Sequence, residues 1–166
     1  MKTLKKMAMK YDALYILLAD DDDDDRLFFK EALEEIKVKT ILNTVNDGSQ
    51  LMNYLNKPGI RLPHVVFLDL YMPVKSGMEC LMEIRRNFRL KDLTVAIYST
   101  SGSDNIVEEA FVKGANIYIK KPYDFSALKN ILAQVINLNW QYYTSGLKKE
   151  NFLLNITHME NVVSRA

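Results

Sequence analysis

Short apolar strand patterns alternate with helical patterns five times along this chain, and this alternation limits the folds that it can adopt. The strand patterns cover residues 15–19, 40–45, 65–68, 94–99 and 117–120, and the helical patterns cover residues 26–36, 49–55, 78–88, 106–113 and 128–138. Strands that each lead into a helix form right-handed crossovers, which place them in one parallel sheet with helices on both faces. We therefore predict a doubly wound α/β fold.

Composition and charge exclude several classes of protein. The chain has 166 residues, 48% of them hydrophobic, which suits one globular domain. Its net charge of +1 offers no overall field for nucleic acid or an anionic membrane surface. The N-terminal residues carry no secretory signal, and no window is apolar enough to span a membrane. A single cysteine, Cys80, excludes an internal disulfide, so we expect a soluble, cytoplasmic protein with Cys80 buried on a helix.

The third strand pattern is the most apolar and ends at a carboxylate. Residues 65–68 read Val-Val-Phe-Leu, which is typical of a strand covered on both faces, and Asp69 follows at once. Open α/β sheets bind their ligands in the crevice beyond the carboxyl ends of the strands. Pro73 then prevents further sheet pairing, and Gly77 opens the next helical pattern. We predict that Asp69 accepts a phosphoryl group.

Polar residues follow the other strands at the same point, where the carboxyl ends of parallel strands converge. These residues are Asp20, Asp21, Ser99, Thr100, Lys120 and Lys121. A hard cation such as Mg²⁺ relieves the repulsion between neighbouring carboxylates. Lysine and small hydroxyl groups donate hydrogen bonds to phosphate oxygens. The set is therefore sufficient for an aspartate to form an acyl phosphate beside a metal ion.

Four spaced motifs resemble the response-regulator receiver domain of two-component signalling, in the single-domain, chemotaxis-regulator-like form. They are Ile16-Leu17-Leu18-Ala19-Asp20-Asp21, Leu68-Asp69-Leu70-Tyr71-Met72-Pro73 with Gly77, Ile97-Tyr98-Ser99-Thr100, and Tyr118-Ile119-Lys120-Lys121-Pro122. The resemblance covers roughly residues 15–138. It implies a flavodoxin-like five-stranded sheet with strand order 2-1-3-4-5. It also implies a receiver domain at residues 13–138, between an N-terminal arm at 1–12 and a C-terminal extension at 139–166 that forms a helix or tail without a separate output domain.

The resemblance also implies roles for the strand-end residues. Asp69 would be the phosphoacceptor, and Mg²⁺ would be held by Asp20, Asp21, Asp69 and the backbone carbonyl of Tyr71. Ser99, Thr100 and Lys121 would bind the phosphoryl oxygens, Ser99 and Tyr118 would form the conformational switch, and the bond before Pro122 would be cis. The phosphoryl donor would be a histidine kinase or a phosphotransfer protein, and phosphorylation and dephosphorylation would be self-catalysed, without any other enzymatic activity.

Two features differ from the usual family pattern. The acidic pair continues into Asp22–Asp25, which we interpret as a solvated loop or a helix N-terminus capped by Asp23 or Asp24. Tyr71 is bulkier than the small polar residue often found there, which bears on the lifetime of the phosphoryl group. His64 and His158 are isolated in sequence, and we expect both on the surface.

The sequence leaves alternatives open for the role of the C-terminal extension and for the function of the protein. Residues 139–166 are too short for a DNA-binding domain, and their aromatic residues suggest either a dimer contact or a tail packed on the domain. The homodimer would use residues 106–113, 117–120 and 128–138 together with this extension. Two other functions stay open, a Mg²⁺-dependent aspartyl-phosphate phosphohydrolase and a phosphorylation-independent scaffold. The phosphohydrolase would need a second aspartate where this chain has Tyr71.

Overall fold

The computed structural model describes residues 12–145, with side chains up to residue 137. The strands are β1 (Leu14–Ala19), β2 (Thr40–Val45), β3 (Val65–Leu68), β4 (Thr94–Ser99) and β5 (Ile117–Lys120). The helices are α2 (Asp23–Glu34), α3 (Gly48–Leu55), α4 (Gly77–Arg86), α5 (Asp104–Val112) and α6 (Phe125–Ser145). Each strand is followed by one helix, as the alternation of sequence patterns predicted.

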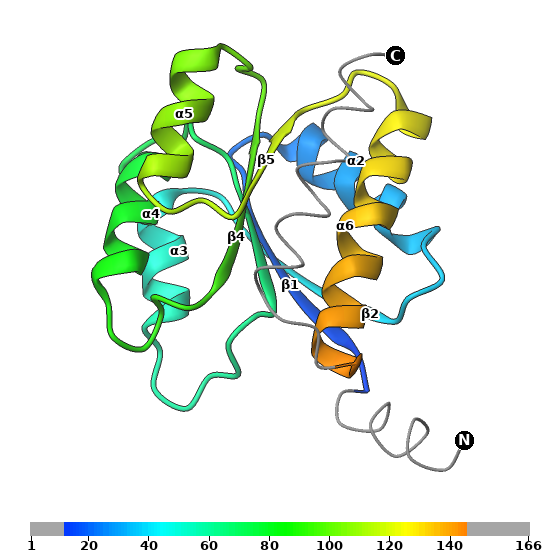
Figure 1. Cartoon of the computed structure of the whole chain (residues 1–166), viewed down its shortest axis with the longest axis horizontal. Coiled ribbons are helices and arrows are strands. Elements are labelled where there is room, and N and C mark those ends of the chain that lie inside the picture. The colour runs from blue at the N-terminus through cyan, green and yellow to red at the C-terminus, as the bar shows by residue number, and fades with distance from the viewer. Residues whose placement is uncertain (1–11, 146–166) are drawn as a thin grey trace.

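The five strands form one parallel sheet in the order β2-β1-β3-β4-β5, which confirms the predicted topology (Figure 1). In register, Leu18 pairs with Phe67 of β3, and Leu68 pairs with Ile97 of β4. β1, β3 and β4 therefore end beside one another at one edge of the sheet. β2 has the most polar strand sequence and lies at the outer edge, as its composition predicted.

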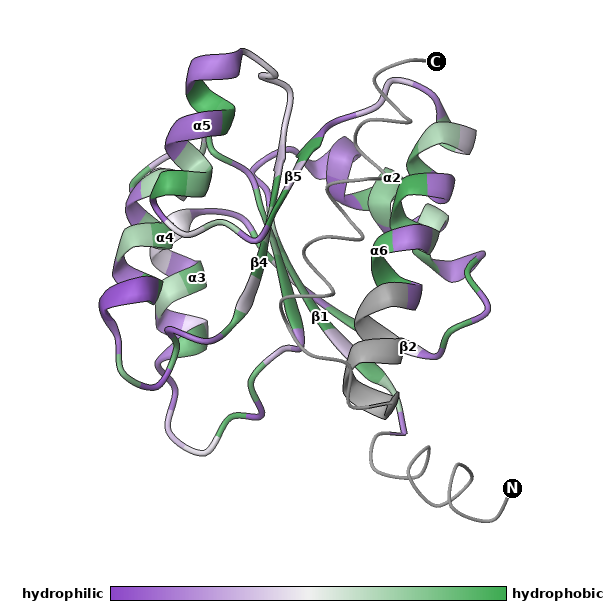
Figure 2. Ribbon diagram, in the orientation of Figure 1, coloured by the Kyte–Doolittle hydropathy of each residue, from purple (hydrophilic) through white to green (hydrophobic). Residues whose placement is uncertain are grey.

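Helices cover both faces of the sheet, and one hydrophobic core lies between the sheet and the helices on each face. Alternate strand residues point to opposite faces, so Leu17 belongs to the core that includes residues of α3, α4 and α5, whereas Ile16 belongs to the core that includes residues of α2 and α6. Figure 1 shows the same two groups of helices on either side of the strands. Hydrophobic residues run along the central strands (Figure 2), because these strands are covered on both faces.

Capping residues set where the helices begin, and the sequence patterns predicted these positions less accurately than the strands. α2 begins at Asp23 because the Asp22 side chain accepts hydrogen bonds from the backbone N–H groups of Asp24 and Asp25. The expectation of a cap at Asp23 or Asp24 was therefore wrong by one or two residues. α4 begins with a capping box, in which Ser76 and Glu79 each accept the other's backbone N–H.

The C-terminal helix is longer than its sequence pattern. α6 continues beyond residue 138, where the predicted extension starts, and reaches Ser145. Residues 1–11 of the predicted N-terminal arm, residues 146–166 of the extension and therefore His158 lie outside the described residues. None of the helices that the structure describes is long and apolar enough to cross a membrane.

Two other expectations concern single side chains. Cys80 is buried on α4, as predicted, and its thiol donates to the Gly48 carbonyl oxygen at 3.4 Å. His64 is not on the surface, because only 7% of it is exposed and its Nδ1 accepts the Tyr15 backbone N–H at 2.8 Å. The backbone N–H of His64 in turn donates to the Tyr15 carbonyl oxygen. The histidine thus pairs with β1 at the opposite end of the sheet from the strand-end carboxylates.

Candidate functional site

The strand-end residues are fixed by backbone hydrogen bonds that continue the sheet ladder beyond the strands. Asp20 donates its backbone N–H to the Val45 carbonyl oxygen at 3.1 Å, and Asp69 donates to the Ala19 carbonyl oxygen at 2.9 Å. The Lys121 N–H donates to the Ser99 carbonyl oxygen at 2.8 Å. The backbone at these positions therefore continues the hydrogen bonding of the sheet, and it brings the side chains together at one edge.

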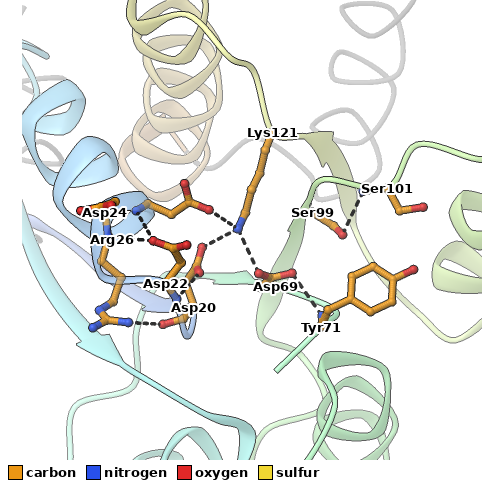
Figure 3. A network of polar contacts seen from close by, with 10 residues as sticks. Asp20, Asp22, Asp24, Arg26, Asp69, Tyr71, Ser99, Ser101 and Lys121 are labelled. Carbon is orange, nitrogen blue, oxygen red and sulfur yellow. Dashed lines mark hydrogen bonds and ion pairs between the residues drawn. The ribbon is translucent and has the colours of Figure 1, made fainter. Parts of the chain in front are cut away.

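The ammonium group of Lys121 is the centre of this site. Its Nζ lies 2.8 Å from Oδ2 of Asp20, 2.8 Å from Oδ2 of Asp25 and 2.9 Å from Oδ2 of Asp69. Figure 3 shows the lysine side chain pointing toward Asp20 and Asp69. The lysine side chain is only 7% exposed. Because a buried charge is costly unless it is paired, the three carboxylates are what keep this ammonium in place.

Burial and charge act against each other in this cluster. Burial lowers the pKa of Lys121, but its close contacts with the carboxylates of Asp20, Asp25 and Asp69 outweigh it and raise the pKa above its ordinary value. Burial raises the pKa of Asp20, and the nearby Lys121 opposes this rise only in part. The Tyr98 ring centroid lies 5.2 Å from the Lys121 Nζ, so the ring also faces the cation.

Three of the strand-end carboxylates are placed to share a cation. Oxygen atoms of Asp20, Asp21 and Asp69 all lie within 4.8 Å of one another. Asp20 is fully buried, and its Oδ2 has the Lys121 ion pair but no well-directed hydrogen bond. Hard divalent cations such as Mg²⁺ prefer carboxylate oxygens, so this donor set fits one. The acidic cluster can therefore bind a divalent metal.

Backbone hydrogen bonds within the loop after β3 fix the position of Asp69. Its Oδ1 accepts the backbone N–H of Tyr71 at 3.2 Å, and Gly77 donates its N–H to the Leu70 carbonyl oxygen at 2.9 Å. A Cβ atom on Gly77 would lie 2.0 Å from the Asp69 carbonyl oxygen, so only glycine fits there. Val74 in the same loop has a φ of 68°, which is strained for a β-branched residue. The Tyr71 side chain is 57% exposed.

The hydroxyl residues at the end of β4 and the aromatic residue of β5 differ in their surroundings. Ser99 is fully buried at the end of β4, and its hydroxyl oxygen accepts the Ser101 backbone N–H at 3.4 Å. Thr100 follows it and is exposed. Tyr118 is 6% exposed, and its hydroxyl donates to the Ser101 carbonyl oxygen at 2.7 Å. Burial raises the pKa of Tyr118. The ring of Tyr118 is therefore turned into the protein rather than toward solvent.

The expected cis bond before Pro122 is wrong, because none of the peptide bonds in the described residues is cis. The trans form of an X–Pro bond is intrinsically favoured by about 0.5–1 kcal/mol. With the trans bond, the Lys121 side chain already reaches all three carboxylates. No contact in this arrangement requires the less favourable isomer.

Sequence reasoning missed three residues of the site. Asp25 was expected to be solvated but contacts Lys121, Tyr98 faces the lysine, and Arg26 donates to the Asp20 carbonyl oxygen at 2.6 Å. A cap at Asp22 would have indicated Asp25, because the third residue after a cap lies on the first helical turn, close to the strand end. No sequence signal separated Tyr98 from an ordinary core aromatic residue.

Comparisons with known proteins agree with this geometry. A sequence model of the response regulator receiver domain family matches residues 16–133. The probable methanogenesis regulatory protein FilR2 of Methanothrix harundinacea (strain 6Ac) is 31% identical over 127 residues, which covers 75% of this chain and 82% of that protein. The residues that the family model matches include every strand-end residue described above.

Solved structures show the same similarity. The phosphorylated cyanobacterial phytochrome response regulator RcpA superimposes with a TM-score of 0.71 at 28% identity, over 82% of this chain and 97% of that one. The Mn²⁺-bound form of response regulator Rcp1, a protein of Synechocystis, gives a TM-score of 0.69 at 25% identity, over 81% and 97% of the two chains. The described fold is thus that of these single-domain regulators.

Proposed function

This chain belongs to the response regulator receiver domain family of two-component signalling, and we propose from that premise that Asp69 accepts the phosphoryl group of a phosphorelay. The observation that carries the proposal is the Lys121 ammonium, which lies within 2.9 Å of the carboxylates of both Asp20 and Asp69. A nucleophilic carboxylate and a phosphate-binding cation are then adjacent before any donor arrives. The donor would be a histidine kinase or a phosphotransfer protein.

The reaction needs only a nucleophile and charge compensation. A carboxylate oxygen of Asp69 would form a bond to phosphorus as the P–N bond of the donor phosphohistidine breaks. The electron pair of that bond leaves with the imidazole, which then takes up a proton. The signal would end by hydrolysis of the acyl phosphate. Water attacks phosphorus, the bond to Asp69 breaks, and the carboxylate and inorganic phosphate are released. Both steps would be self-catalysed by the receiver.

Each neighbouring group would have one task in this scheme. Mg²⁺ would be held by Asp20, Asp21, Asp69 and the backbone carbonyl of Tyr71. When bound, the ion would offset the negative charge that gathers as two anions approach. The Lys121 ammonium, with hydroxyl groups of Ser99 and Thr100, would bind the phosphoryl oxygens. The burial of Ser99 and Lys121 favours this assignment, because hydrogen bonds are stronger where water is excluded.

We also propose that Ser99 and Tyr118 report phosphorylation at the outer face. The Ser99 hydroxyl would move toward the phosphoryl group, and the Tyr118 ring would fill the space that it leaves. Tyr118 is buried here and bonded to Ser101, so its outward rotamer has to give up that hydrogen bond. Phosphorylation shifts the balance between the two rotamers only if it binds one arrangement better.

The outer face that would read this switch lies over α5, β5 and the start of α6. Phe111 on α5 is 40% exposed, and Tyr123 between β5 and α6 is 93% exposed. Exposed aromatic residues are common at protein interfaces. We propose a homodimer through this face and the C-terminal extension. Light scattering with and without beryllofluoride tests it, and an unchanged monomer in both states would contradict it.

A cytoplasmic location stays a prediction from the sequence.

Mass spectrometry after treatment with acetyl phosphate and Mg²⁺ tests the phosphoacceptor directly. We expect one phosphate on the wild-type chain, sensitive to hydroxylamine and located at Asp69. The Asp69→Asn variant should show none, whereas Asp104→Asn, at an exposed aspartate of α5, should be labelled like the wild type. Absence of labelling in the wild type would favour a scaffold that works without phosphorylation. Rapid turnover of small phosphate esters would favour a phosphohydrolase.

A further inference from the structure

The third carboxylate on Lys121 has no task in the scheme above. Oδ2 of Asp25 lies 2.8 Å from the Lys121 Nζ, as close as Asp20 and closer than Asp69 at 2.9 Å. The residue comes from the first turn of α2, whereas Asp20 and Asp69 follow strands. A helix therefore contributes a carboxylate to a site otherwise assembled from strand ends.

The start of α2 fixes Asp25 in this position. The Asp22 side chain accepts the backbone N–H of Asp25 at 3.1 Å and that of Asp24 at 2.8 Å. This cap makes Asp25 the third residue of the helix, where the helix dipole also favours a negative charge. Asp24 is exposed. The run of aspartates thus contains residues with different surroundings, and Asp25 is the member that contacts the buried lysine.

The Lys121 ammonium is shared among three carboxylates, with hydrogen bonds to Asp25 and Asp69 and an ion pair with Asp20. An ammonium group carries three N–H donors and no acceptor, and three carboxylates surround it. A phosphoryl group on Asp69 needs at least one of these donors. The phosphoryl group then competes with the carboxylates around the lysine for these donors.

Exposure identifies which carboxylate yields. The side chains of Asp20 and Asp69 are 0% and 8% exposed, whereas that of Asp25 is 38% exposed. Asp25 can therefore turn into water, where its charge is well solvated, and the other two cannot without being buried unpaired. Charge acts in the same direction, because three carboxylates and one ammonium already sum to −2 before the phosphoryl group adds its own negative charge.

We propose that Asp25 is a positioning residue that competes with the phosphoryl group for Lys121. In the unphosphorylated protein it holds the lysine beside Asp69, and in the phosphorylated protein it has to be displaced. Asp25 therefore limits how tightly a phosphoryl group is held on Asp69. This inference rests on the proposed function, because it takes Asp69 as the acceptor.

Titration of the full chain with beryllofluoride at saturating Mg²⁺, followed by calorimetry, measures this competition without turnover. We expect Asp25→Asn to bind beryllofluoride about three- to five-fold more tightly than the wild type, the factor that corresponds to a partly exposed ion pair. Asp24→Asn is the matched control, because it removes the same charge one residue away, and it should bind like the wild type. Asp25→Glu keeps the charge and should restore wild-type affinity. Asp25→Ser replaces Asp25→Asn if the latter does not fold.

A second readout is the half-life of the acyl phosphate formed from acetyl phosphate, which should lengthen in Asp25→Asn by a similar factor. The inference is overturned if Asp25→Asn and Asp24→Asn give the same change, because a general charge effect then explains it. It is also overturned if Asp25→Asn binds beryllofluoride more weakly, because Asp25 then only supports the lysine. In both cases a labelled Asp69 in the wild type leaves the proposed function intact. A wild-type chain without labelling or beryllofluoride binding overturns both.

Discussion

The Nζ atom of Lys121 lies 2.9 Å from Oδ2 of Asp69, although the two residues are separated by 52 positions in the chain. β3 and β5 are both neighbours of β4, so the residues that follow them lie at the same edge of the sheet. The contact is buried on both sides. It therefore depends on the whole sheet being formed and links the stability of the fold to the state of the site.

Replacing Lys121 by methionine should destabilise the fold. The change leaves Asp20 and Asp69 buried beside each other without their cation, and breaking a buried ion pair in this way costs roughly 3 kcal/mol. Urea unfolding with and without Mg²⁺ checks this, because a bound cation should recover part of the loss. Lys120→Met is the control, since Lys120 is exposed and its replacement should change the unfolding free energy by about 0.5 kcal/mol or less.

Gly77→Ala should distort the loop that carries Asp69. The added Cβ would lie 2.0 Å from the Asp69 carbonyl oxygen and 2.8 Å from the Leu70 Cα, and backbone atoms cannot move aside cheaply. We expect a loss of about 3 kcal/mol in unfolding free energy together with reduced labelling by acetyl phosphate. Gly59→Ala is the comparison, because nothing lies within 4 Å of its new Cβ and only its φ of 71° is unfavourable. Its cost should be about 1 kcal/mol, with labelling unchanged.

Val74→Asn should stabilise the protein. Val74 has a φ of 68° and is 83% exposed, so its side chain contributes little packing to offset the strain. Asparagine adopts this conformation more readily, and we expect a gain of about 1 kcal/mol, read as a higher Tm. Val74→Ile keeps the branched Cβ and should give no gain. An equal rise in Tm for both variants would show that backbone strain at this position is not the cause.

Stability should fall as the pH drops from about 6.5 to 4, and His64 should account for part of the fall. Burial lowers the pKa of His64 from its ordinary 6.5 to about 4. The unfolded chain therefore takes up this proton at a higher pH than the folded protein does, and up to roughly 3 kcal/mol of stability is present above pH 6.5 and lost toward pH 4.

The His64→Asn variant isolates that contribution. An asparagine oxygen can accept the Tyr15 backbone N–H in place of the His64 Nδ1, but it does not titrate. Urea unfolding of both proteins at pH 7.5 and at pH 4.5 should show a smaller loss in the variant. Equal losses would mean that the carboxylates alone cause the acid sensitivity.

Much of the fold could be predicted from the sequence, because its signals are local. The mainly apolar runs at residues 94–99 and 117–120 match β4 and β5 to the residue, because most of their side chains are buried in the sheet. The start of α2 could not be placed to the residue, because six successive aspartates are all acceptable caps by composition. Which of them becomes the cap depends on where β1 ends and the chain turns.

The same division applies to the site. The positions of Asp20, Asp69 and Lys121 just after strands were enough to predict that they meet, because parallel strands present their carboxyl ends at one edge. Only the tertiary structure decided that Asp25 shares Lys121, that Tyr98 faces its ammonium, that His64 is buried against β1 and that the bond before Pro122 is trans. Each of these depends on the direction of a side chain or the isomer of one bond within the packed domain. Local sequence patterns determine neither, because both depend on contacts with residues far away in the chain.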